Sequence, residues 1–73
     1  MPIRFRRIAP GGVVMWLAGY RDGVILWSAN ERHACAIDVT PEQMAVLQGL
    51  LLQSIENGTT IEAVAGAPSG ALH

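Results

Sequence analysis

The sequence predicts an α+β domain, in which a mostly antiparallel meander of four strands packs against one amphipathic helix. Two observations support this prediction: apolar arms flank Arg21-Asp22-Gly23, and apolar residues follow a helix start at Thr40-Pro41 with helical spacing. The strands are expected over about 3–8, 13–20, 24–29 and 33–39, the helix over about 41–56, and a further short strand over 59–64. Residues 1–64 would form a single domain, with 65–73 as a flexible C-terminal tail.

The first expected strand alternates apolar and charged side chains. Ile3 and Phe5 should face the core, while Arg4 and Arg6 should face solvent. A strand of this kind is typical of a solvated sheet edge, where charges prevent pairing with other chains.

The stretch from Trp16 to Trp27 is the strongest hairpin signal, because Asp-Gly between branched and aromatic arms suits a tight turn. We favour a two-residue turn at Asp22-Gly23, which pairs Tyr20 with Ile25 and puts both tryptophans on one face. A three-residue turn beginning at Arg21 would place them on opposite faces and leave one exposed for a partner.

The helix start is the best-defined boundary. Thr40 is a suitable N-cap, Pro41 fits the first helical position, and Gln43 completes a capping box. Asn57-Gly58 should stop the helix. Its buried stripe is expected to contain Met44, Leu47, Leu51 and Ile55, widened by Val46 and Leu50.

The composition indicates association with another protein. Apolar residues make up 51% of a 73-residue chain, more than one small copy can hide, so we expect an exposed patch and a homodimer. The net charge of −1 provides no broad positive field for nucleic acid. A single cysteine excludes a disulfide framework and favours the cytoplasm, and no stretch is long enough to span a membrane.

Catalytic signals are weak. His33 and Cys35 would share a strand face, so the imidazole could activate the thiol, but no orienting third group is evident. We therefore expect no enzymatic activity, no metal site and no cofactor.

The predicted function is a non-enzymatic protein-binding module that occupies a partner's surface. We expect it to act as an inhibitor or accessory subunit, a class that includes small proteins of phages and mobile elements. The expected interaction residues combine aromatic anchors, one basic residue and part of the helix: Trp16, Tyr20, Trp27, Arg21, Leu52 and Gly49. An alternative is a nucleic-acid-binding module that uses Arg4, Phe5, Arg6 and Arg7.

Overall fold

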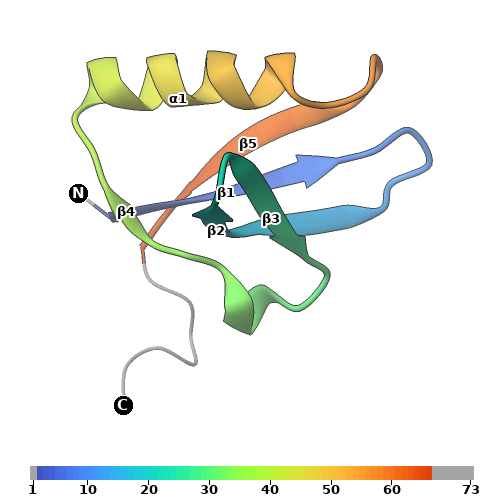
Figure 1. The fold of residues 1–73 in the computed structure, drawn as a ribbon, viewed down its shortest axis with the longest axis horizontal. Coiled ribbons are helices and arrows are strands. Elements are labelled where there is room, and N and C mark those ends of the chain that lie inside the picture. Colours follow the sequence, from blue (N-terminus) through green and yellow to red (C-terminus); the bar gives the residue numbers. More distant parts are fainter. Residues whose placement is uncertain (1, 67–73) are drawn as a thin grey trace.

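The computed structural model describes residues 2–66 and confirms the α+β class: strands form one antiparallel sheet, and one α-helix packs against it (Figure 1). In chain order the elements are β1 (Pro2–Ile8), β2 (Val14–Arg21), β3 (Val24–Ser28), a 3-10 helix (Glu31–His33), β4 (Ile37–Asp38), α1 (Pro41–Gln53) and β5 (Thr60–Ala65). Of the expected tail, Ala65 belongs to the sheet and Gly66 follows it, whereas 67–73 lie outside the described residues.

β1 is the centre of the sheet. One of its edges pairs with β5 along nearly the whole strand, from Ile3↔Ala65 to Ile8↔Thr60. The other edge is shared, because its C-terminal half pairs with β2 and its N-terminal end pairs with β4. The interpretation of this strand as a sheet edge was therefore wrong, and the expected short strand near 59–64 is its most extensive partner.

The sheet divides between β2 and β4. β2 pairs with β1 only as far as Arg6↔Trp16, and β4 takes over at Ile3↔Ile37. At the division, the Cys35 amide donates a hydrogen bond to the Leu17 carbonyl at 2.8 Å. The remainder of β2 is therefore free of β1 and continues as a two-stranded ribbon with β3.

The β2–β3 hairpin has the two-residue turn that we favoured. Asp22 and Gly23 have φ values of 53° and 81°, as both central residues of a type I′ turn require, and Tyr20 pairs with Ile25. The conclusion drawn about the tryptophans was nevertheless wrong. The register shifts between Leu17 and Gly19, so that a β-bulge inserts one unpaired residue into β2.

The bulge places the two tryptophans on opposite faces of the ribbon. Trp16 pairs with Ser28, and Leu17 pairs with Trp27, so the expected alignment is displaced by one residue. This does not expose either ring for a partner: Trp16 is buried and Trp27 is half-buried.

We predict that Gly23→Ala will lower the free energy of unfolding by about 1 kcal/mol, because a Cβ is disfavoured at positive φ. The added atom would meet only the Tyr20 hydroxyl at 4.0 Å, so the cost is conformational. Urea unfolding followed by tryptophan fluorescence measures it. Asp22→Asn is the control, because asparagine tolerates the same backbone conformation. An unchanged unfolding midpoint for Gly23→Ala would contradict this turn geometry.

The strand expected over 33–39 is much shorter in the structure. Asn30 Oδ1 accepts a hydrogen bond from the Arg32 amide at 3.0 Å and caps the 3-10 helix that ends at His33. Asparagine competes effectively for nearby backbone groups in this way. Only Ile37–Asp38 forms a strand, β4.

α1 begins as predicted. The Gln43 amide donates to Thr40 Oγ1 at 3.2 Å, and the Thr40 amide donates to Gln43 Oε1 at 3.0 Å, which completes the capping box. Pro41 occupies the first helical position, where its missing amide removes no bond.

The helix is shorter than predicted and ends at Gln53. Ser54 is the C-cap, and its hydroxyl donates to the Leu51 carbonyl at 2.8 Å, so a side chain satisfies one of the last carbonyls. Asn57-Gly58 forms a later turn that leads into β5, with Gly58 at a φ of 87°.

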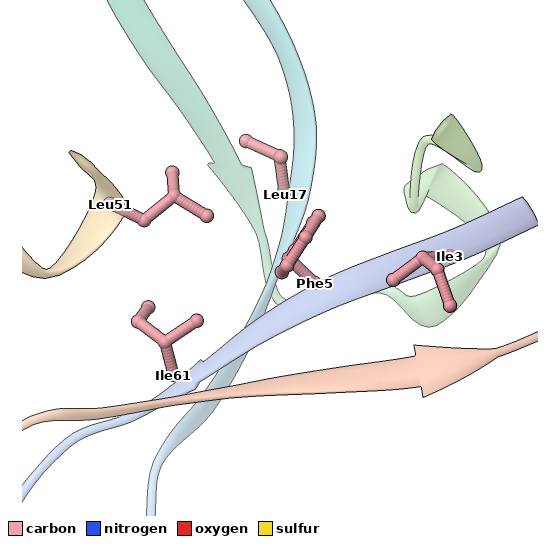
Figure 2. Close-up of a cluster of buried hydrophobic side chains, with 5 residues drawn as sticks. All are labelled: Ile3, Phe5, Leu17, Leu51 and Ile61. Atoms are coloured by element: carbon pink, nitrogen blue, oxygen red, sulfur yellow. The ribbon is translucent and has the colours of Figure 1, made fainter. Parts of the chain in front are cut away.

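The core lies between α1 and the sheet. Figure 2 shows Leu51 of α1 pointing toward Phe5, Leu17 and Ile61, with Ile3 further along β1. Phe5 is fully buried at the middle of this cluster. Burial of these side chains is the main source of the fold's stability.

The inner side of α1 matches the predicted stripe. Met44 and Leu47 pack against the core, and Gln48 Nε2 donates to the Ile61 carbonyl of β5 at 2.9 Å. Ile55 also packs against the core, but it lies beyond the end of the helix. The predicted widening of that stripe was wrong, because Val46 and Leu50 are 63% and 54% exposed. In Figure 1, no other described element covers the side of α1 that faces away from the sheet.

Candidate protein-interaction groove

An apolar groove separates α1 from the β2–β3 hairpin. Its volume is about 360 Å³, which is within the range of ligand-binding pockets. Three segments line it: α1 contributes Leu47, Leu50 and Leu51, the hairpin contributes Leu17, Gly19, Tyr20 and Ile25, and the approach to β4 contributes Cys35 and Ile37.

Local features of the hairpin explain why the groove remains open. The bulge before Gly19 bends β2, and β2 has already separated from β1 at this point. Gly19 lines the groove with its backbone, and a Cβ at this position would lie 4.0 Å from Leu26, which is not a groove residue. The hairpin and α1 form the two walls of the groove, and both contribute to the core cluster through Leu17 and Leu51.

Exposed apolar side chains extend the groove outward. Leu50 and Tyr20 stand on opposite walls, and Tyr20 is 72% exposed. Val46 lies one helical turn before Leu50, so these two side chains share one side of α1. The groove and these exposed side chains offer apolar surface that can bury the apolar groups of a partner.

The groove carries no formal charge. No charged residue lines it, and Glu42 in the first turn is the only charged residue of α1. Arg21 lies at the hairpin tip beside the groove, 3.9 Å from Asp22, with both side chains almost fully exposed. Burial of apolar surface, rather than acid–base chemistry, is what this arrangement can provide.

The structure separates the predicted interaction residues. Tyr20 lines the groove, and Arg21 follows it at the exposed tip. Leu52 is 46% exposed but does not line the groove, and a Cβ at Gly49 would meet open space. Trp16 is buried, so it cannot anchor a partner without rearrangement.

Sequence reasoning missed Leu50 and Val46 as surface residues because they fit the edge of the buried stripe. The signal that could have identified them is the width of the apolar pattern: α1 has apolar residues at 46, 47, 50, 51 and 52, which cover more than one side of a helix.

Arg4 and Arg6 both form ion pairs with glutamates of the same chain. The Arg4 side chain is almost buried, which corrects its predicted exposure, and its Nη1 lies 2.6 Å from Glu31 Oε2. Arg6 Nη2 lies 2.6 Å from Glu62 Oε1. Both guanidinium groups also lie near the Trp16 ring, at 4.9 and 5.4 Å from its centroid.

Arg7 and Phe5 occupy the other face of β1. The Arg7 guanidinium lies 5.2 Å from the centroid of the Trp27 ring, and its Nη2 is 3.4 Å from Met15 Sδ. Phe5 is fully buried and has no face available for stacking on a base. The four residues of the suggested nucleic-acid surface therefore do not form one exposed patch.

His33 and Cys35, the weak catalytic signal in the sequence, share no hydrogen bond in the described structure. His33 Nδ1 lies 2.7 Å from Ser28 Oγ, whereas the exposed Cys35 lines the groove. Within residues 2–66, no three His, Cys, Asp or Glu side chains are grouped so that they could hold a metal ion.

No helix in the described part of the chain has the length and apolar character needed to cross a bilayer. No protein-family model matches the chain, and no curated protein or solved structure is significantly similar to it.

Proposed function

We propose that this chain is a non-enzymatic protein-binding module whose binding surface is the groove between α1 and the β2–β3 hairpin. The observation that supports this proposal is the uncharged groove with Leu50 and Tyr20 exposed on its two walls. Aromatic and aliphatic anchors around an apolar hollow are typical of interface centres. The module would act as an inhibitor or accessory subunit by covering part of its partner.

The free thiol of Cys35 supports a reducing compartment such as the cytoplasm. The nucleic-acid alternative has weaker support, because Arg4 and Arg6 are paired with glutamates. Binding of nucleic acid depends on the number of phosphates that free cations neutralise.

We predict that Leu50→Glu will prevent partner capture while leaving the fold intact. A carboxylate placed in an apolar interface loses its hydration without gaining a counter-charge, whereas in the free protein it stays in water. Affinity capture from the native host, with proteins identified by mass spectrometry, compares wild type with this variant. Circular dichroism checks that both are folded.

Leu52→Glu is the matched control. It introduces the same charge on the same helix, at a residue of similar exposure that does not line the groove. The proposal expects this variant to capture the same proteins as wild type. If Leu50→Glu retains every protein that wild type captures, the groove is not the binding surface.

A further inference from the structure

We infer that the occupant of the groove is α1 of a second copy of this chain, in a symmetric dimer with the two helices antiparallel. This inference rests on the proposed function, since it fills the same groove. In this homodimer, each copy inserts Val46 and Leu50 into the groove of the other copy.

The size of the groove fits this occupant. A cavity of about 150 Å³ holds one benzene molecule, so a groove of about 360 Å³ can take two apolar side chains. Helices that bind in grooves present such anchors at positions i and i+4. Val46 and Leu50 have this spacing, and both are exposed on α1.

The position of Leu50 favours a symmetric arrangement. Leu50 is part of the groove wall and is also exposed, so it can line one groove and enter another. In a twofold dimer the same surface must be complementary to itself. The exposed side chains of Val46 and Leu50 beside the groove meet this requirement, because each copy supplies both the inserted side chains and the groove that receives them.

Charge is compatible with two copies facing each other. Glu42 is the only charged residue of α1 and lies eight positions before Leu50, or about 12 Å along the helix. An antiparallel crossing at Leu50 therefore places the two Glu42 residues at opposite ends, about 24 Å apart along the helix axes. That separation exceeds the Debye length of about 10 Å at 0.1 M salt.

A stable dimer needs a sizeable part of the surface. A stable interface removes about 800 Å² from each partner, roughly one sixth of the accessible surface of 4884 Å². α1 is about 20 Å long, and its outer side is not covered by any other described element (Figure 1). We infer that the interface comprises α1, the adjoining groove and the exposed Tyr20.

Site-directed disulfide formation tests the contact. Leu50→Cys and Ala45→Cys are each made in a Cys35→Ser background, so that the only thiol lies on α1. Both positions are exposed, and they lie on different sides of the helix. We expect Leu50→Cys to oxidise to a covalent dimer and Ala45→Cys to remain monomeric under the same conditions. Equal cross-linking of the two variants would overturn the inference.

Sedimentation velocity over a range of concentrations measures the association itself. We expect wild type and Leu52→Glu to form a dimer. For Leu50→Glu we expect a dimer dissociation constant that is higher by about tenfold or more. A wild type that stays monomeric throughout would overturn the inference. If Leu50→Glu still prevented capture of another protein in that case, the proposed function would stand and only the identity of the occupant would be wrong.

Discussion

Phe5→Ala is expected to cost about 3–5 kcal/mol of stability, the range for removing a fully buried aromatic side chain. Phe5 is completely inaccessible and lies at the centre of the core cluster, where β1, β2, β5 and α1 all contribute side chains. A domain of this size has a total stability of only about 3–10 kcal/mol. We therefore expect the variant to be largely unfolded at 37 °C.

Thermal and urea unfolding, followed by circular dichroism and tryptophan fluorescence, measure this effect. Phe5→Leu is the control, because it keeps most of the apolar volume and should cost clearly less. A Phe5→Ala variant within about 1 kcal/mol of wild type would mean that the core can close around the cavity, contrary to the packing described here.

The second large effect is expected at Arg4. Arg4→Ala removes the ion pair with Glu31, the hydrogen bond from Arg4 Nε to the Gly66 carbonyl at 3.0 Å, and the contact with the Trp16 ring. We expect a loss of about 2 kcal/mol. This is less than for a fully buried pair, because the Glu31 side chain is 53% exposed.

The Arg6–Glu62 pair offers an internal comparison. Its shortest N–O distance is the same 2.6 Å, but both of its side chains are substantially exposed, at 35% and 46%. Double-mutant cycles to alanine, Arg4 with Glu31 and Arg6 with Glu62, should give the larger coupling energy for the first pair. The second should fall in the range of about 0.2–1 kcal/mol and weaken in high salt. Equal coupling energies would contradict the expectation that burial of Arg4 strengthens its ion pair with Glu31.

The elements that were predicted correctly are those set by local chemistry. The Thr40–Gln43 capping box and the Asp22-Gly23 turn depend on neighbouring residues, so the sequence contains the whole interaction. Alternation likewise identified Ile3 and Phe5 as core residues. The α+β class follows from these local signals together.

The predictions that failed depended on distant parts of the chain. Arg4 is buried because Glu31 and Trp16 approach it, and nothing in its own strand indicates those partners. The bulge in β2 changed the face of one tryptophan relative to the other, although the turn was predicted correctly. Groove residues such as Leu50 were missed because α1 lies across the sheet in a direction that helical periodicity alone does not specify.

The pairing of β1 with β5 also has a consequence for how quickly the chain folds. Their paired residues are more than 50 positions apart in the sequence, whereas the β2–β3 ribbon closes over two residues. Bringing distant segments together costs entropy before any contact is gained, and domains dominated by such contacts fold more slowly. We therefore expect the joining of β1 to β5 to set the folding rate, with β2–β3 and α1 forming earlier.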